Sequence, residues 1–214
     1  MGLSARLRGT TRDRTRRVIL PDSGPRAKSS PPERTSLASM SQCRTSTCRL
    51  ACAVLVDQRG WLLLQERDEF APVDPDVWGL VGGHAHPEES FAEAAVRELA
   101  EETEIDVMGD PRVSNWRLWW AGDLPAAPKA TPDLTDSWQI WIGATTLTDD
   151  DVVCHEGRQI VFVDPQTLPE LQLGRGPQHL LPLLCASSDY QAMVREGLSK
   201  PAPAIAAEDA GQAP

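Results

Sequence analysis

The sequence predicts an α/β fold in which a mixed sheet is covered by helices on both of its faces. Two observations lead to this class. Apolar, strand-like segments occur both before and after one strongly helical segment at residues 90–103, and a second helical segment follows at residues 177–198. Strands and helices that alternate along a chain favour a layered α/β/α sandwich over an all-helical or an all-strand fold.

The strands are predicted from apolar runs and alternating patterns, taken in order along the chain. Residues 48–57 and 60–65 are joined by a turn-like segment and together indicate a hairpin. The polar, proline-containing segment 66–76 is expected to be a loop that faces the substrate. Further strands are predicted at residues 78–83, 113–121, 137–146 and 159–163, and residues 177–198 are predicted as one helix despite Pro182.

The segment 90–103 has the features of a helix that starts at Ser90. It is rich in alanine, the strongest helix former, and contains no glycine or proline. Ser90 and Glu93 have the spacing of a capping box, in which two side chains satisfy free N–H groups of the first turn. Small apolar residues at helical spacing form a stripe that is expected to lie on the core.

Three glutamates share the opposite face of this predicted helix. Glu98 and Glu102 are one turn apart and Glu101 lies beside them, so the carboxylates fall within an arc of roughly 100°. Like charges at this spacing repel each other, and burial would make one carboxylate take up a proton unless a cation were bound. Hard oxygen ligands select Mg²⁺ or Mn²⁺, and Mg²⁺ usually also binds waters and substrate phosphates. The alternative is a solvated, glutamate-rich helix face.

Residues 83–105 resemble the Nudix box, whose pattern is G-x5-E-x7-R-E-U-x-E-E-x-G-U, with U a bulky apolar residue. The pattern's second glycine is replaced by Glu104, just past the predicted helix, where the chain commonly adopts a left-handed conformation that favours glycine. If that conformation is kept, Glu104 costs on the order of 1 kcal/mol. The matching positions are filled, in order, by Gly83, Glu89, Arg97, Glu98, Leu99, Glu101, Glu102 and Ile105.

The resemblance implies a Nudix-like α/β/α sandwich and a hydrolase that cleaves a nucleoside diphosphate linked to another group, using Mg²⁺ or Mn²⁺. It implies that Glu98, Glu102 and the backbone carbonyl of Gly83 bind the metal ion. Glu101 is expected either as a further ligand or as a group that helps to deprotonate the attacking water. A metal ion in such a site lowers the pKa of water and neutralises charge on the leaving phosphate.

The resemblance also implies residues that support these ligands. Arg97 and Glu89 are expected to orient the carboxylates, and Arg97 is counted with the catalytic set. Some members of the family use an acidic residue from outside the box, and Glu156, just before the strand predicted at 159–163, is the candidate here. The alternative for Glu156 is an ordinary turn residue. His84 and His86 flank the glycine loop and, without a third nearby ligand, are expected to be solvent-facing loop residues rather than zinc ligands.

Five of the seven tryptophans fall on two neighbouring predicted strands. Trp119 and Trp141, one on each strand, are candidates for stacking on a nucleotide base, which would stabilise binding by about 1–3 kcal/mol. Trp138 and Trp141 are expected to point to opposite faces of their strand. The alternative for each tryptophan is packing in the core.

Three functions follow from these expectations. The first is hydrolysis of a nucleoside triphosphate, ordinary or oxidised, to a nucleoside monophosphate and pyrophosphate. The second is hydrolysis of ADP-ribose or another dinucleotide or nucleotide sugar, because substrate choice depends on loops outside the box. The third is a non-catalytic Nudix-fold module that senses a nucleotide, although such a module would be expected to lose carboxylates of the box, all of which are present here.

Composition divides the chain into three parts. Residues 1–48 form a basic extension that is expected to be disordered, residues 49–198 form the predicted hydrolase domain, and residues 199–214 form a flexible Ala/Pro-rich tail. The basic extension has three interpretations: a targeting segment, an electrostatic tether to polyanions, or a chain start assigned upstream of Met40.

Charge and cysteine usage limit the partners and the compartment. The chain has a net charge of −10 although its first 49 residues hold 11 Lys and Arg against 3 acidic residues. An acidic domain argues against a stable nucleic-acid partner. The resemblance implies a small nucleotide as the partner, and a monomer or homodimer is expected. Five cysteines without a C-x-x-C pair do not predict a disulfide framework, which favours the cytoplasm. No apolar run approaches the roughly 18 residues of a membrane span.

Overall fold

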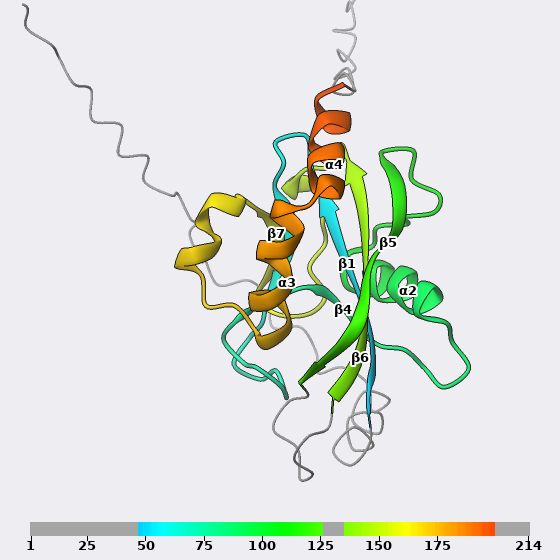
Figure 1. Ribbon diagram of the computed structural model, residues 1–214, viewed down its shortest axis with the longest axis vertical. Coiled ribbons are helices and arrows are strands. Elements are labelled where there is room, and N and C mark those ends of the chain that lie inside the picture. The colour runs from blue at the N-terminus through cyan, green and yellow to red at the C-terminus, as the bar shows by residue number, and fades with distance from the viewer. Residues whose placement is uncertain (1–46, 126–134, 200–214) are drawn as a thin grey trace, which may run out of the picture. The chain divides into compact units, whose positions relative to one another are not determined.

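A computed structural model of the chain describes residues 47–125 and 135–199, and these residues contain one mixed sheet between two layers of helix (Figure 1). The predictions for the basic extension at 1–48, with Met40, and for the tail at 199–214 lie almost wholly outside the described residues. The strands are β1 Arg49–Val56, β2 Leu62–Glu66, β3 Trp78–Gly79, β4 Val81–His84, β5 Val113–Pro125, β6 Thr135–Thr145 and β7 Gln159–Val163. The helices are α2 Phe91–Thr103, α3 Arg175–Ala186 and α4 Ser188–Ser199, with short 3₁₀ helices at Asp149–Asp151 and Pro165–Glu170.

Strand β1 lies at the centre of the sheet and makes it mixed. It runs parallel to β6 from Arg49↔Ser137 to Val56↔Ala144 and antiparallel to β4. The predicted hairpin of residues 48–65 is therefore only partly formed, because β1 pairs with β2 only at Val56↔Leu62. Beyond that pair, β2 takes β7 and β3 as its neighbours instead. The α/β class with a mixed sheet is confirmed.

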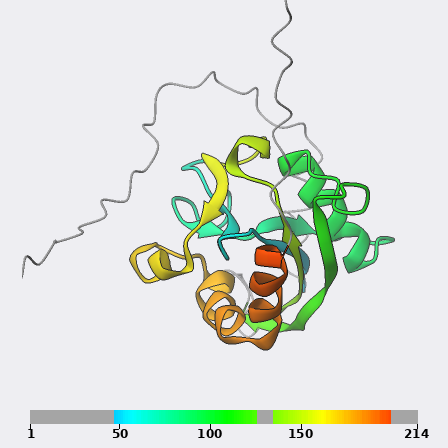
Figure 2. The same ribbon diagram turned by 90° about the horizontal axis from the view of Figure 1, so that it is seen from above.

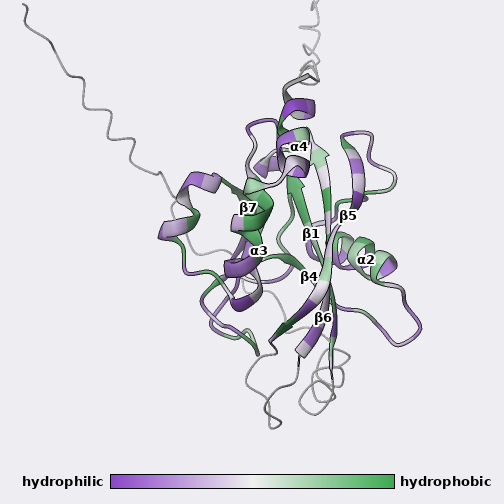
Figure 3. Cartoon of the chain, in the orientation of Figure 1, coloured by the Kyte–Doolittle hydropathy of each residue, from purple (hydrophilic) through white to green (hydrophobic). Residues whose placement is uncertain are grey.

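Helix α2 covers one face of the sheet, and helices α3 and α4 cover the other (Figure 2). Alternate residues of β1 supply both cores, as expected for side chains that point in opposite directions along a strand. Val54 packs in the cluster that contains Leu184 of α3, whereas Leu55 packs in the cluster that contains Leu99 of α2. Figure 3 shows apolar residues along β1 and α3. Because both faces are covered, the α/β/α sandwich is confirmed.

The start of α2 follows the sequence prediction. Ser90 is the N-cap, its Oγ accepts a hydrogen bond from the backbone N–H of Glu93 at 3.2 Å, and the Glu93 carboxylate accepts from the backbone N–H of Ser90 at 2.9 Å. This reciprocal capping box fixes where the helix begins. The buried face of α2 contains Ala94, Ala95 and Leu99, and Glu102 is buried with them.

The helix ends at Glu104, which adopts the left-handed conformation expected of the glycine it replaces (φ 63°, ψ 10°). Its exposed carboxylate lies 2.8 Å from Nε2 of His155. We expect Glu104→Gly to be more stable than Glu104→Ala by roughly 0.5–1 kcal/mol, because both variants lose the exposed pair but only glycine relieves the left-handed backbone. Urea unfolding measures this difference, and an alanine variant as stable as the glycine variant would contradict the expectation.

Two predicted elements are each divided in the structure, and β5 extends to Pro125 instead of ending at residue 121. The predicted strand 78–83 is interrupted at Leu80, so that β3 pairs with β2 while β4 pairs with β1. The predicted helix 177–198 is two helices, and the break occurs at Ser187 rather than at Pro182, which lies inside α3. Ser187 is extended (φ −79°, ψ 155°), and its Oγ accepts a hydrogen bond from the N–H of Tyr190. This side-chain bond begins α4 in the manner of an N-cap.

Two further observations concern the state of the cysteines and the possibility of a membrane-spanning helix. Cys52, Cys154 and Cys185 are free, whereas Cys48 is disulfide-bonded, which the sequence had not led us to expect. Within residues 47–125 and 135–199, no helix has both the length and the apolar character that crossing a membrane requires.

Candidate active site

The three glutamates on the polar face of α2 differ sharply in exposure. Glu102 is 5% exposed, the Glu98 side chain is 15% exposed and the Glu101 side chain is 59% exposed. The difference arises because the helix packs through Leu99 onto the sheet, which turns Glu98 and Glu102 toward β4 and leaves Glu101 at the rim. Two carboxylates of the predicted cluster are therefore buried together.

The Glu102 carboxylate is held by one donor on each of its oxygens. The backbone N–H of Gly82 donates to Oε1 at 3.1 Å, and the side-chain amide of Gln65 donates to Oε2 at 2.8 Å. Burial raises the pKa of Glu102 well above its ordinary value, and the negative charges of Glu156 and Glu98 raise this pKa further. A buried carboxylate with such neighbours is stabilised in its charged form by a cation.

The Glu98 carboxylate lies directly against the backbone of Gly83. A β-carbon at position 83 would lie only 2.8 Å from Oε1 of Glu98, so any residue other than glycine would displace the carboxylate. Burial raises the pKa of Glu98, the guanidinium of Arg97 lowers it, and the charges of Glu101 and Glu156 raise it. Gly83 thus allows the Glu98 carboxylate to approach the backbone closely. A metal site that combines carboxylate and backbone carbonyl ligands requires such an approach.

This donor set fits a hard divalent cation. Glu98, Glu102 and the backbone of Gly83 offer only oxygen atoms, which are the ligands that Mg²⁺ and Mn²⁺ prefer. In the part of the chain that the structure describes, no group of three His, Cys, Asp or Glu side chains is arranged to hold a metal ion by itself. A cation at Glu98 and Glu102 would therefore complete its ligands with backbone carbonyl, water and phosphate oxygens, as is usual for Mg²⁺.

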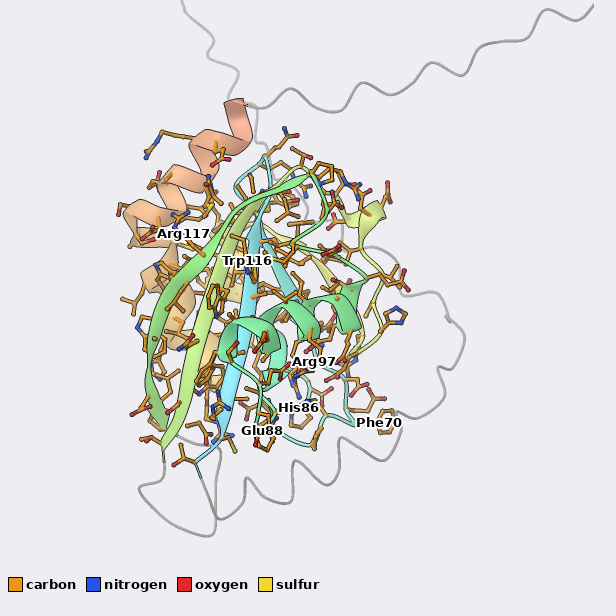
Figure 4. The ribbon with its side chains drawn as sticks, turned by 90° about the vertical axis from the view of Figure 1, so that its right-hand side faces the viewer. Phe70, His86, Glu88, Arg97, Trp116 and Arg117 are labelled. Atoms are coloured by element: carbon orange, nitrogen blue, oxygen red, sulfur yellow. The ribbon has the colours of Figure 1, made fainter. Side chains whose placement is uncertain are left out.

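Arg97 connects the cluster to the loop that precedes α2 (Figure 4). Its Nε and Nη2 donate to the two oxygens of Glu89 at 2.8 and 2.9 Å, and Nη2 also donates to the backbone carbonyl of His84 at 3.1 Å. Its Nη1 donates to Glu98 at 2.9 Å and to Glu101 at 3.0 Å. The hydrogen bonds from Arg97 lower the pKa of Glu89 to about 2. One guanidinium thus orients three carboxylates.

Glu156 reaches the cluster through the loop that follows the 3₁₀ helix Asp149–Asp151. The backbone N–H groups of Val153 and His155 donate to the carbonyls of Thr103 and Glu102 at 3.3 and 3.0 Å, which attaches the loop to the end of α2. The charge of Glu156 contributes to the raised pKa values of both Glu98 and Glu102. The structure therefore brings Glu156 to the buried pair, although it is distant in sequence.

The two tryptophan candidates are not brought together. Trp141 stacks on Trp116, with ring centroids 6.0 Å apart, and packs on the α2 side of the sheet. Trp119 packs in the core on the α3 and α4 side. The strand register is irregular between Leu118 and Trp120, so the cluster against which Trp119 packs, and not simple alternation along the strand, shows which face it occupies. One base-binding pocket cannot contain both side chains. Trp138 also lies on the α3 and α4 side, opposite Trp141 as expected.

The histidines and the hollow beside them lie at the start of α2. His86 is exposed, and its backbone N–H donates to Glu89 at 3.0 Å. A shallow hollow here is lined by His86, Glu88, Glu89 and Glu93. Three of these four residues are acidic, so the hollow does not suit a polyanionic substrate by itself.

Gln65 is the site residue that the sequence analysis did not identify. It occupies the fourth position of β2, is 1% exposed, and contacts both Glu102 and the backbone of Glu156. The available signal was a polar residue at the end of the apolar run Trp61–Leu64 in a strand predicted to be buried. A buried polar side chain needs hydrogen-bond partners, and the carboxylate of Glu102 is one of them.

The raised pKa values predict how the stability of the metal-free protein depends on pH. The pKa values of Glu98 and Glu102 are higher in the folded protein than in the unfolded chain, where they are about 4.5. Their contribution to the free energy of unfolding is therefore fully present below pH 4.5 and is lost as pH rises through the folded-state pKa values. The pKa of Glu89 is instead lowered to about 2 in the folded protein. Its contribution to the free energy of unfolding is therefore present above pH 4.5 and is lost only as pH falls toward 2. Above about pH 5, the contribution of Glu89 to stability is therefore constant, whereas that of the buried pair falls as pH rises toward the folded-state pKa values.

We therefore expect Glu102→Gln to flatten the fall in stability above about pH 5. Urea unfolding in EDTA, on wild type and variant in the same buffers, measures this difference and cancels the contributions that the two proteins share. Parallel curves for the two proteins would show that Glu102 does not titrate in this range.

Comparisons with known proteins identify the family and the fold. A family model described as the NUDIX domain matches residues 47–183. The fold is similar to that of the dihydroneopterin triphosphate pyrophosphohydrolase of E. coli, with 18% identity, 65% of this chain and 97% of that chain covered, and a TM-score of 0.51. It is also similar to the NUDIX domain of Shewanella oneidensis NrtR complexed with ADP ribose, with 14% identity, 77% and 99% covered, and a TM-score of 0.50.

A third solved structure, of a protein from Deinococcus radiodurans, has 18% identity over 65% of this chain and 83% of that chain, with a TM-score of 0.50. At these identities the likeness concerns the fold. No curated protein sequence matches the chain.

Proposed function

The chain belongs to the Nudix family and is a Nudix-type pyrophosphohydrolase; from this premise we propose that it cleaves a nucleoside triphosphate, ordinary or oxidised, to a monophosphate and pyrophosphate with Mg²⁺ or Mn²⁺. The observation that carries the proposal is the buried pair of Glu98 and Glu102 against the backbone of Gly83. Two desolvated carboxylates, with Glu156 beside them, form a site whose charge a divalent cation would compensate.

Each residue of the cluster has a role in this proposal. Glu98, Glu102 and the carbonyl of Gly83 would hold the cation, which when bound lowers the pKa of a water and neutralises charge on the pyrophosphate. Glu101 and Glu156 are exposed at the edge of the carboxylate cluster. One of them would accept the proton of the attacking water. Arg97 would keep Glu98 and Glu101 oriented.

Arg97 is in turn held by Glu89, which binds the guanidinium through both carboxylate oxygens. A pair of parallel hydrogen bonds of this kind fixes the plane of the guanidinium as well as its position. Glu89 would therefore act on the reaction only through Arg97, and its own carboxylate is not expected to touch the cation or the substrate.

Two substrate classes compete for this site. A triphosphate presents phosphate oxygens that could complete the ligands of a cation held by only two side chains. The second candidate is ADP-ribose or another dinucleotide or nucleotide sugar. It is favoured by the similarity to the Shewanella NrtR domain, whose structure contains ADP ribose and whose fold corresponds over 77% of this chain. An acidic chain with a net charge of −10 supports a small nucleotide rather than a nucleic acid as the partner.

The test is hydrolysis by the purified protein across nucleoside triphosphates, oxidised triphosphates, dinucleotides and nucleotide sugars, with the products identified. We expect cleavage within a pyrophosphate that needs Mg²⁺ or Mn²⁺ and stops with EDTA. A monophosphate and pyrophosphate as products would establish the first class, whereas cleavage of ADP-ribose alone would establish the second. A folded protein that binds nucleotide but cleaves none of the panel with either metal would contradict the proposal and indicate a sensing module.

A further inference from the structure

We infer that Gln65 is a positioning residue, which holds the Glu102 carboxylate for cation binding and links it to the loop that carries Glu156. The inference rests on the proposed metal-dependent reaction and adds to it a residue from outside the helix. Gln65 is not expected to touch the cation or the substrate, and its effect on the reaction passes through Glu102.

The backbone of Gln65 is fixed on both sides. Within β2 it lies opposite Gly79 of β3 and opposite Ile160 of β7, so strands on both sides constrain its position. The side chain is 1% exposed. A side chain on a strand that is paired on both sides and packed beneath a helix cannot move away from its partners without disturbing the sheet. Gln65 is thus a rigid support for whatever it contacts.

The side-chain amide of Gln65 has a partner at each end. Nε2 donates to Oε2 of Glu102 at 2.8 Å and to the backbone carbonyl of Glu156 at 3.3 Å, while Oε1 accepts from Nη1 of Arg67 at 3.2 Å. The amide orientation follows from these partners. The reverse orientation would place its carbonyl against the Glu102 carboxylate and its NH₂ group against the Arg67 guanidinium, and both contacts would be repulsive.

These contacts explain why an amide suits this position. Glu102 receives one hydrogen bond on each oxygen, from Gly82 and from Gln65, which fixes the plane of the carboxylate and leaves further lone pairs free for a cation. A direct contact from Arg67 would instead compensate the charge of Glu102 with an ion pair and compete with the cation. Gln65 lies between the two charged groups and is hydrogen-bonded to both, so the guanidinium acts on Glu102 from a greater distance.

The same residue attaches the Glu156 loop to the sheet. Gly157 has φ +79°, and a β-carbon there would lie 2.5 Å from the carbonyl oxygen of Glu66 and 3.3 Å from Cγ of Gln65. The glycine thus allows the loop to approach β2 closely enough for the bond from Gln65 to the carbonyl of Glu156. One amide therefore contacts both the Glu102 carboxylate and the Glu156 loop, in addition to the backbone hydrogen bonds that attach this loop to the end of α2.

The test is the Mn²⁺ affinity of Gln65→Met, measured by titration with the free Mn²⁺ followed by EPR, together with kcat and KM on the best substrate. Methionine keeps the length of the side chain and removes the hydrogen bonds. We expect Mn²⁺ binding to weaken and kcat to fall by about 10–100-fold, as for other residues that orient metal ligands, with a smaller change in KM.

Gln159→Met is the matched control. Gln159 lies on the neighbouring strand β7, and its amide also donates to a glutamate, Glu66, at 2.6 Å, but it does not contact Glu102. We expect Mn²⁺ affinity and kcat close to those of the wild type. Equal losses in Gln159→Met and Gln65→Met would show a general effect of removing a hydrogen-bonded amide from this part of the sheet and would overturn the inference.

A double-mutant cycle with Glu102→Gln tests whether Gln65 acts through Glu102. If it does, adding Gln65→Met to Glu102→Gln changes the weaker Mn²⁺ affinity that remains at Glu98 and Gly83 by less than about threefold, whereas independent effects would multiply. Independent effects, or wild-type affinity in Gln65→Met, would overturn the inference and leave the proposed function intact. A wild-type protein that binds no Mn²⁺ and hydrolyses no substrate would overturn both. If Gln65→Met does not fold, Gln65→Asn, whose amide is one methylene too short, takes its place.

Discussion

Glu102→Gln is expected to remove nearly all hydrolysis while leaving the fold intact. The variant keeps the shape of the side chain and an oxygen that can accept from Gly82, but it deletes the buried charge that would hold the cation. Turnover should fall by on the order of 10³-fold or more, because a catalytic metal supplies several kcal/mol and each 1.4 kcal/mol is a factor of ten. Metal-free stability near neutral pH should change by less than about 1 kcal/mol, since lost hydrogen bonding is offset by relief of charge repulsion.

Two measurements check this expectation. The first is kcat, with Glu104→Gln as control, because it makes the same change of charge two residues along the chain on an exposed carboxylate. The second is the shift in unfolding temperature on adding Mg²⁺, which wild type and Glu104→Gln should show and Glu102→Gln should lose. Wild-type turnover by Glu102→Gln would refute the assignment of Glu102 as a metal ligand.

Arg97→Lys is expected to lower both stability and activity by a large amount. The guanidinium makes hydrogen bonds to three carboxylates and to the carbonyl of His84, and its side chain is only 23% exposed. A lysine carries the same charge but cannot form the paired bonds to Glu89 or span these acceptors. We expect a loss of about 2–4 kcal/mol in the free energy of unfolding, because partly buried carboxylates are left with fewer donors.

Arg112→Lys provides the comparison on the surface of the protein. Arg112 also binds two carboxylates, those of Asp110 and Asp151, but its side chain is 42% exposed. Exposed pairs contribute about 0–1 kcal/mol, so this variant should unfold close to wild type. Urea unfolding of the two variants compares the same chemical change in two environments. A similar loss at both positions would show that burial is not what makes Arg97 important.

The candidate site was predicted best where its geometry is local. The capping box of Ser90, the one-turn spacing of Glu98 and Glu102 and the left-handed end at Glu104 all depend on residues within a few positions of one another. Helical pitch fixes such relations whatever the rest of the chain does. The sequence was less informative where strand partners decide the outcome. The sequence predicted that residues 48–65 form a hairpin in which the two strands pair with each other. In the structure β1 pairs mainly with other strands, among them β4, and β2 pairs with β7.

The helix at residues 177–198 shows a different limit of the sequence analysis. Proline was the residue expected to disturb it, yet Pro182 lies within α3 and the chain breaks at Ser187. Ser187 gains a hydrogen bond from the N–H of Tyr190 that starts a new helix. Serine competes for backbone groups in this way at many positions. Pattern alone could not select this serine from its neighbours as the end of one helix and the start of the next.

The sequence by itself determined the family resemblance and the helix that carries the carboxylates, and it led to the expectation that they bind a divalent cation. Only the tertiary structure decided that Glu102 is buried while Glu101 is exposed, that Trp119 and Trp141 lie on opposite faces, and that Gln65 contacts Glu102. The physical reason is the range of the forces involved. Propensity, capping and helical pitch act between neighbours in the chain, whereas burial and the meeting of β2, α2 and the Glu156 loop require distant segments to pack together.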